Sequence, residues 1–197
     1  ADRVVREATE AKNDVESYIY AMRDRIIDGG DLYAYIDSKG RQELNQLLDD
    51  TENWLYGEGE EATKDQSKEK LWALKKQGDA AEVRIREEAG RPAAVDSVLI
   101  AIEEYKTFVK SQEEKYAHIA QSEKDKVAEK VTETQQWLKA EQEKQSKLGK
   151  HDNPSLTVAA LQNKEKELRT LAKPIVSTPI PKKEEPKPEE KKPETTE

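Results

Sequence analysis

The residues best suited to acid–base or metal chemistry in this chain are its two histidines, His118 and His151. Both fall in segments that we predict to be loops, and neither has a second histidine at the spacing that helical zinc sites use. The adjacent glutamates at 60–61 and 87–88 could supply an acid and a base. Because 39% of the residues are charged, such pairs are more typical of a solvated helix face. We therefore predict no catalytic site and no metal site, and we expect that the chain is not an enzyme.

Two glycine clusters are the only segments that could bend around a phosphate. Neither Gly29-Gly30 nor Gly57-Glu58-Gly59 follows a predicted strand or precedes the Lys-Ser/Thr pair of a nucleotide-binding loop. The chain also has no cysteine, which excludes disulfides and thiolate metal ligands. We therefore expect no cofactor in this chain.

The elements that position these residues are helices with narrow apolar faces. Only 34% of the residues are hydrophobic, and many recur at steps of three and four, which is the helical period. Together with glycine, proline and capping signals, these stripes predict helices at about residues 2–27, 39–56, 63–110, 122–149 and 154–173. The predicted fold class is therefore all-α, an elongated antiparallel helical bundle over residues 1–176.

The middle of the long helix is ambiguous because of Gly90-Arg91-Pro92. A glycine just before a proline fits the end of one helix and the start of the next, but a proline can also kink a continuous helix. We favour a kinked, nearly continuous rod shared by two three-helix units that divide near residue 91. Beyond residue 176, prolines are interspersed with lysines and glutamates, and we predict that residues 177–197 are disordered.

The few aromatic residues form two similar groups. This recurrence fits a duplicated helical unit, or two helical segments that each need an aromatic anchor. In both cases we expect structural anchors, with each Trp-Leu pair buried against the tyrosine of the preceding helix. The groups are Tyr18 with Trp54 and Leu55, and Tyr105 with Trp137 and Leu138.

Trp72 differs from the other two tryptophans. It follows the stripe residue Leu71, so it lies about 100° around the helix from that residue. Trp72 is therefore either the edge of the core or part of a contact surface.

The overall charge and hydropathy exclude several partners. The net charge of −8 argues against a nucleic-acid backbone as the main partner. No apolar run approaches the ~18 residues that a membrane span needs. A chain without cysteine is compatible with a reducing compartment, and we expect a cytoplasmic protein. Ala1 falls inside a predicted helix, so we expect the chain to be part of a longer protein.

Two segments resemble a known family. Residues 11–18, Ala-Lys-Asn-Asp-Val-Glu-Ser-Tyr, resemble a string in the lid helix of the heat-shock protein 70 superfamily. Residues 50–60, with the string Glu-Asn-Trp-Leu-Tyr and an acidic glycine turn, resemble more specifically the heat-shock protein 110 branch. Residues 88–92 and 171–175 also fall where that branch has similar strings, and the resemblance covers about residues 4–176.

The resemblance implies that the parent protein is a co-chaperone, a nucleotide-exchange factor for heat-shock protein 70 that also keeps unfolded clients soluble. In that family the helical bundle reaches the ATPase domain of heat-shock protein 70, whose cleft opens so that ADP leaves. ATP itself is expected only in an N-terminal domain that is absent from this chain. Residues 192–197 lack the Glu-Glu-Val-Asp ending that binds tetratricopeptide co-chaperones, so that function is not carried over.

The resemblance also suggests where the partner binds. Asp49 and Glu52 lie three residues apart, outside the apolar stripe of their helix, so we expect both to face water as neighbours. In the heat-shock protein 110 family, residues at these two positions contact the partner's ATPase domain; the alternative is that both are solvating charges. A spectrin-like helical spacer is the alternative function. The negative charge of the chain opposes a third class, a protein that lies on a membrane surface.

Overall fold

The computed structural model describes residues 2–182, and every regular element within them is helical. The predicted all-α class is confirmed. Residues 183–197, most of the segment predicted to be disordered, lie outside the described residues. The long helices are α1 (Asp2–Ile26), α2 (Ser38–Leu55), α3 (Lys64–Lys110), α4 (Gln121–Ser146) and α5 (Val158–Val176). Two short 3₁₀ turns are η1 (Tyr33–Tyr35) and η2 (Glu114–Tyr116).

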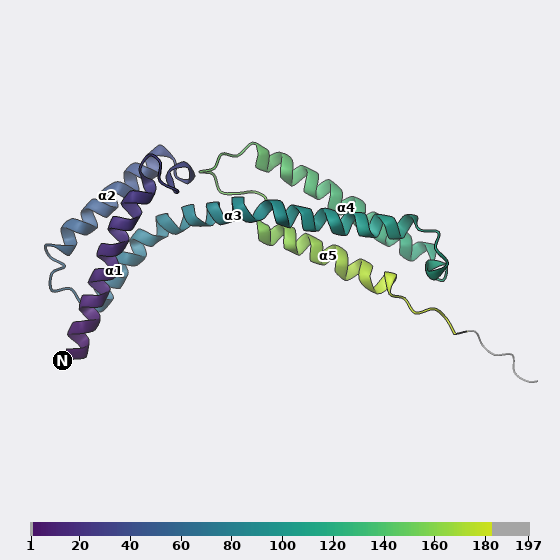
Figure 1. The fold of residues 1–197 in the computed structure, drawn as a ribbon, viewed down its shortest axis with the longest axis horizontal. Coiled ribbons are helices and arrows are strands. Elements are labelled where there is room, and N and C mark those ends of the chain that lie inside the picture. Colours follow the sequence, from purple (N-terminus) through teal and green to yellow (C-terminus); the bar gives the residue numbers. More distant parts are fainter. Residues whose placement is uncertain (1, 183–197) are drawn as a thin grey trace, which may run out of the picture.

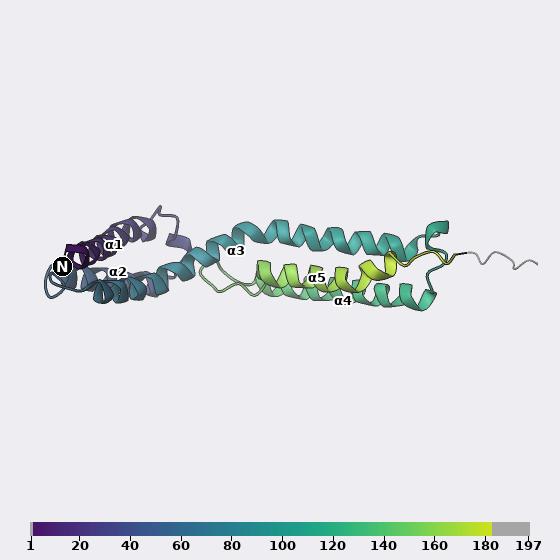
Figure 2. The ribbon, with the colours of Figure 1, turned by 90° about the horizontal axis from the view of Figure 1, so that it is seen from below.

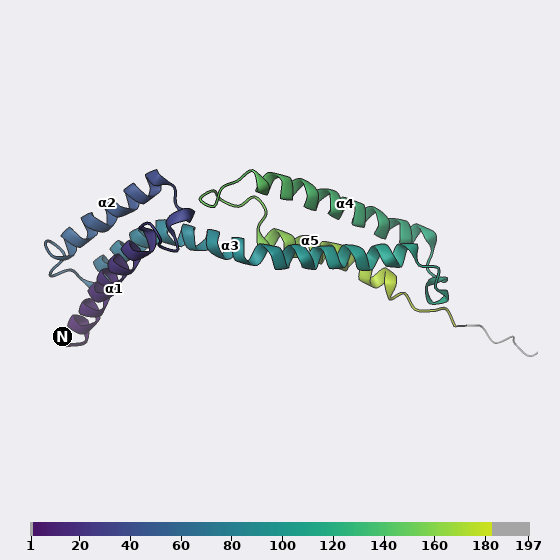
Figure 3. The same ribbon diagram turned by 45° about the horizontal axis from the view of Figure 1, so that its top comes forward.

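Helix α3 runs along most of the molecule and connects its two ends (Figure 1). α1 and α2 pack on the first half of α3, and α4 and α5 pack on its second half. Seen from below, the molecule is narrow, and α4 and α5 lie together along one side of α3 (Figure 2). An intermediate view again shows α1 and α2 beside one half of α3, and α4 and α5 beside the other half (Figure 3). We call α1, α2 and residues 64–90 the N-terminal bundle, and α4, α5 and residues 91–110 the C-terminal bundle.

Each bundle has its own buried core, formed by residues three or four apart on each helix. Burying one such aliphatic side chain is worth ~1.5–3 kcal/mol, so these clusters supply most of the stability. The core of the N-terminal bundle includes Val15, Ile19, Met22, Ile26, Leu32, Leu44, Leu48, Leu74 and Ala81. The core of the C-terminal bundle includes Val98, Ile102, Tyr105, Val127, Val131, Leu138, Leu161 and Leu168.

Two prolines lie inside helices. α3 continues through Pro92, so this proline does not divide the rod into two helices. A Cβ atom at the neighbouring Gly90 would lie 3.1 Å from Val158 Cγ2, so the glycine lets the first turn of α5 approach α3 closely. α5 also runs past Pro174 and ends at Val176, slightly later than predicted.

The start of α5 differs from the prediction. The helix begins at Val158, and Thr157 is its N-cap. The predicted start at Pro154 is wrong because the preceding loop makes contacts with α4 instead. The backbone N–H of Leu156 donates to Gln145 Oε1 at 3.1 Å, a contact that local sequence signals do not reveal.

The loop between α4 and α5 also joins the two bundles. Arg84, near the middle of α3, donates from Nη1 to the Tyr35 carbonyl at 2.8 Å and from Nη2 to Asn153 Oδ1 at 3.0 Å. Beside it, Lys150 Nζ lies 3.4 Å from Glu88 Oε1. One arginine therefore contacts both η1 of the N-terminal bundle and the loop of the C-terminal bundle.

Candidate partner-binding surface

Asp49 and Glu52, the two carboxylates predicted to contact a partner, both bind Arg23 of α1. Arg23 Nη2 donates to Asp49 Oδ1 and to Glu52 Oε2, each at 2.6 Å. The Asp49 side chain is 58% exposed, whereas that of Glu52 is 26% exposed. Asp49 therefore faces water as predicted, whereas Glu52 is only partly exposed, and a cation from α1 binds both carboxylates. We call these three residues the Arg23 clamp; its one cation and two acids leave an excess negative charge.

Arg23 and Glu52 keep their charges because the hydrogen bond between them favours both ionised forms. The hydrogen bond to Glu52, and to a smaller extent the one to Asp49, raises the pKa of Arg23 above its ordinary value. The same Arg23 hydrogen bond lowers the pKa of Glu52. Exposed ion pairs contribute only ~0–1 kcal/mol to stability, so the clamp mainly fixes where the carboxylates lie.

Two exposed tyrosines lie beside the clamp. Tyr56 is 60% exposed and Tyr20 is 50% exposed. The Tyr56 hydroxyl donates to Glu16 Oε1 and lies 3.5 Å from the Tyr20 hydroxyl. The hydrogen bond to Glu16 raises the pKa of Tyr56, so the phenol remains protonated. Half-exposed tyrosines with one hydroxyl already oriented are well suited to a protein contact, where aromatic residues dominate the binding energy.

The helical period explains why the three clamp residues, the two tyrosines and Glu16 lie together. On each helix the three positions are separated by steps of three and four, so they form one ridge along it. The two ridges face each other across the contact between α1 and α2. Sequence analysis missed the tyrosines, although large aromatic residues outside the apolar stripe were an available signal. The α1–α2 ridge consists of Glu16, Tyr20 and Arg23 with Asp49, Glu52 and Tyr56.

The predicted anchor Tyr18 packs against the core of the N-terminal bundle. A Cβ atom at Gly78 of α3 would lie 2.2 Å from the Tyr18 hydroxyl, so only a glycine leaves room for it. This hydroxyl is buried and finds no hydrogen-bond partner among the described residues. Burial raises the pKa of Tyr18 to about 12. The anchor therefore depends on a close approach of α1 to α3.

The anchors Trp54 and Leu55 are buried to different degrees. Leu55 is 7% exposed, whereas Trp54 is half-buried. The Trp54 indole covers the turn after α2: a Cβ atom at Gly59 would lie 2.8 Å from the ring. Lys70 Nζ lies 5.0 Å from the ring centroid on the α3 side. Trp54 thus closes the end of the bundle and is less buried than its position on the apolar stripe suggested.

The second group of anchors lies in the C-terminal bundle. Tyr105 and Leu138 are each 3% exposed, and the half-buried Trp137 packs against the same core. Lys164 Nζ lies 5.5 Å from the Trp137 ring centroid, and Arg169 Cζ lies 6.0 Å from that of Tyr105. Cations of α5 therefore cover both aromatic rings.

Comparison with known proteins assigns the family. Residues 102–177 match a family model described as HYOU1-like, C-terminal domain. The chain is 36% identical over 180 residues, 91% of its length, to heat shock 70 kDa protein 14 of Arabidopsis thaliana. It is 35% identical over 184 residues, 92% of its length, to the 97 kDa heat shock protein of Strongylocentrotus purpuratus. The chain belongs to the heat-shock protein 70/110 family.

The chain is also 34% identical over 191 residues, 93% of its length, to heat shock 70 kDa protein 4L of Homo sapiens. It spans only 20 to 22% of the length of these three relatives. No solved structure matched it. The sequence-based resemblance to chaperones is therefore confirmed, while the activity of a whole chaperone extends beyond this chain.

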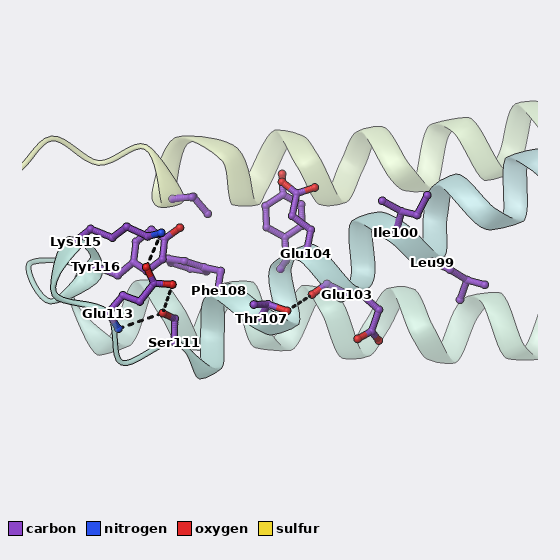
Figure 4. Close-up of a pocket in the computed structure, with 12 residues that line it drawn as sticks. Leu99, Ile100, Glu103, Glu104, Thr107, Phe108, Ser111, Glu113, Lys115 and Tyr116 are labelled. Atoms are coloured by element: carbon purple, nitrogen blue, oxygen red, sulfur yellow. Dashed lines mark hydrogen bonds and ion pairs between the residues drawn. The ribbon is translucent and has the colours of Figure 1, made fainter.

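A concave surface lies at the far end of the C-terminal bundle of this heat-shock protein relative (Figure 4). It has a volume of about 780 Å³ and lies along α3, with Val176 of α5 and the turn η2 at its edges. Leu99 and Ile100 are its exposed apolar residues, at 44% and 63%. Its carboxylates already have cationic partners; Glu104, for example, binds Arg169 at 2.9 Å. The surface is therefore apolar and nearly neutral, without a group poised for chemistry.

The two histidines lie apart in the loops where they were predicted. His118 Nε2 lies 2.6 Å from the Thr178 carbonyl, and His151 Nε2 lies 3.8 Å from Asp152 Oδ1. Within residues 2–182, no group of three or more histidine, aspartate or glutamate side chains is arranged to hold a metal ion. None of the helices described there combines the length and the apolar character of a membrane span.

Proposed function

We propose that this chain is the helical interaction region of a nucleotide-exchange factor for heat-shock protein 70, and that its α1–α2 ridge contacts the partner's ATPase domain. The observation that carries the proposal is the ridge itself, in which two exposed tyrosines flank carboxylates fixed by Arg23. The family relationship supports the chaperone context. The chain would act by contact alone, and ATP would bind only to the parts of the parent outside it.

The chemistry of the ridge indicates what the partner surface must offer. The tyrosine rings would pack on an apolar patch and form the centre of the contact. The excess negative charge of the clamp would pair with a lysine or arginine at the rim and mainly raise the association rate. We place the complex in the cytoplasm, because a chain without cysteine suits a reducing compartment.

The test uses the parent chaperone and measures release of labelled ADP from heat-shock protein 70. Tyr20→Ala combined with Tyr56→Ala should weaken binding at least about tenfold and slow ADP release, because tyrosine is enriched among the interface residues that contribute ~2 kcal/mol or more. Leu99→Ala combined with Ile100→Ala is a matched control, since it removes two exposed apolar side chains from the other bundle. Equal binding and exchange by both double variants would refute the ridge as the interface.

Replacing both Asp49 and Glu52 by lysine would not be a clean test of their predicted contacts with a partner. Lysines at both positions would face Arg23 and disturb the contact between α1 and α2. Asp49→Asn removes one charge and leaves the bond between Arg23 and Glu52 in place. We expect slower association with heat-shock protein 70 and an unchanged helical spectrum. A structural spacer would show no dependence on either set of variants.

We also propose that the parent keeps unfolded clients soluble. In this chain the support is the exposed apolar surface beside Leu99 and Ile100. The double variant that serves as the control for exchange should therefore reduce protection of a heat-denatured client from aggregation. Protection equal to that of the unmodified parent would remove this surface from client binding.

A further inference from the structure

Trp72 is the tryptophan whose side chain is not packed against the core. It is 67% exposed, whereas Trp54 and Trp137 are half-buried against a turn and a core. Lys76 Nζ lies 5.8 Å from the Trp72 ring centroid, so a cation approaches the indole ring. The inward face of α3 here is formed by other residues, including Leu74 and Gly78, which are buried. An exposed indole that does not pack in the core needs another explanation.

The charges nearest to Trp72 are mostly positive. Residues three and four positions away on a helix are neighbours, and around Trp72 they are Lys68, Glu69, Lys75 and Lys76. All four are exposed. The three lysines and one glutamate give this patch a charge of +2 in a chain whose net charge is −8. We call Trp72, Lys68, Lys75 and Lys76 the Trp72 patch.

The other carboxylates on this side of α3 lie farther away. Asp65 and Asp79 are each seven residues from Trp72, which is ~10 Å along the helix. Within residues 2–182, none of the three lysines forms an ion pair, whereas Lys64 on the same helix binds Glu7 at 3.0 Å. The ammonium groups of the patch are therefore available to an external acid.

We propose that the Trp72 patch binds an acidic protein segment that carries an apolar side chain between its carboxylates. The indole would cover the apolar side chain, and the lysines would pair with the flanking carboxylates, which matches the charge of the patch. A nucleic acid also offers negative charge and rings that stack, but its phosphates continue beyond the three lysines onto the rest of a chain whose net charge is −8, whereas a short acidic segment can end within the patch. The patch lies on α3, whereas the α1–α2 ridge belongs to α1 and α2, so this second site does not depend on the first.

The test measures binding of the 197-residue chain to a fluorescein-labelled peptide of glutamates with a central leucine pair. Fluorescence polarisation at low salt should show saturable binding that weakens as salt is added. Trp72→Ala should weaken it about tenfold, as expected for an interface tryptophan. Lys76→Glu should weaken it clearly, whereas the control Lys166→Glu on exposed α5 changes the net charge equally and should have little effect.

Circular dichroism checks folding independently: Trp72→Ala and Trp72→Phe should both keep the helical spectrum of the unmodified chain, because Trp72 is exposed. Trp72→Phe retains an aromatic ring and should therefore keep part of the affinity. The proposal is overturned if the acidic peptide does not bind, or if Trp72→Ala binds it as tightly as the unmodified chain. It is also overturned if a lysine peptide or a single-stranded DNA oligonucleotide binds more tightly than the acidic peptide.

Discussion

Both bundles use ion pairs between two helices, but they balance the charges differently. Between α4 and α5, Lys130 and Lys164 alternate with Glu133 and Glu167, with the cross-helix pairs Lys164–Glu133 at 3.4 Å and Lys130–Glu167 at 3.7 Å. This arrangement is neutral. Between α1 and α2, one Arg23 serves two acids and leaves a negative charge beside exposed tyrosines. The same kind of contact is therefore neutral in one bundle and leaves a negative charge on the surface of the other.

The cores differ in a similar way. In the N-terminal bundle, the fit between Tyr18 and Gly78 leaves a buried hydroxyl without a hydrogen-bond partner. In the C-terminal bundle, aliphatic residues such as Leu161 and Leu168 are fully buried. Both cores contain fully buried aliphatic residues, but the first also holds this unpaired hydroxyl. We expect the two to respond differently to substitution.

The largest effect should come from core deletions in either bundle. Leu48→Ala and Leu168→Ala each remove a completely buried side chain and should cost ~2–5 kcal/mol of the free energy of unfolding. Because both bundles share α3, each variant should shift one common transition, measured by circular dichroism during thermal unfolding. Two separate transitions in either variant would show that the bundles unfold independently.

The second prediction concerns the contact between α1 and α3. Gly78→Ala places a methyl group 2.2 Å from the Tyr18 hydroxyl and 2.6 Å from Met22 Cε, and should cost ~1–3 kcal/mol. Tyr18→Phe removes the hydroxyl and should restore part of that loss. Tyr18→Phe alone should be nearly neutral or stabilising, because the hydroxyl has no partner to lose. Urea unfolding of the two single variants and the double variant gives the coupling; simple additivity would contradict this packing.

Some of this comparison was predictable from the sequence, and the reasons are local. A helix was predicted to start at about residue 63, and Thr63 and Gln66 form a capping box there because both partners lie within one turn of helix. The apolar stripe on α1 predicted the buried residues from Ala11 onward, because the helical period fixes which positions share a face, whereas Val4 and Val5 at its start are exposed. Signals of this kind depend only on neighbours along the chain.

Contacts between distant residues were not predictable. Arg23 lies 26 residues from Asp49 and 29 from Glu52, and nothing in either segment shows that the two helix faces meet. Gly78 resembles an unfavourable residue within a helix until Tyr18 is seen against it. Trp54 was predicted to be a buried anchor, but its ring is only partly buried because it lies at the end of the bundle.

The third prediction compares the two ion-pair groups directly. Arg23→Met and Lys164→Met keep most of each long apolar side chain and remove its charge, so each should cost ~1 kcal/mol or less. The loss should shrink further in high salt, because these pairs are partly exposed. Urea unfolding at low and high salt measures both. A loss of several kcal/mol for Arg23→Met would mean that the clamp is a main support of the bundle.

The smallest effect is the dependence of stability on acid. The hydrogen bond from Arg23 lowers the pKa of Glu52, and the bond from Lys164 lowers that of Glu167, from an ordinary value of 4.5. The folded state therefore releases these protons more readily than the unfolded state. The contribution of each pair is complete above pH 4.5 and is lost as the pH falls through the lower folded pKa.

The two cation variants should change this acid profile unequally. Lys164→Met leaves Lys130 near both Glu133 and Glu167, so part of the pH dependence should remain. Arg23→Met leaves Asp49 and Glu52 as like charges three residues apart, so protonation would then relieve repulsion. We expect its urea midpoint to fall less than that of the unmodified chain between neutral pH and pH values below 4.5. Parallel profiles for all three proteins would show that neither cation governs the glutamate beside it.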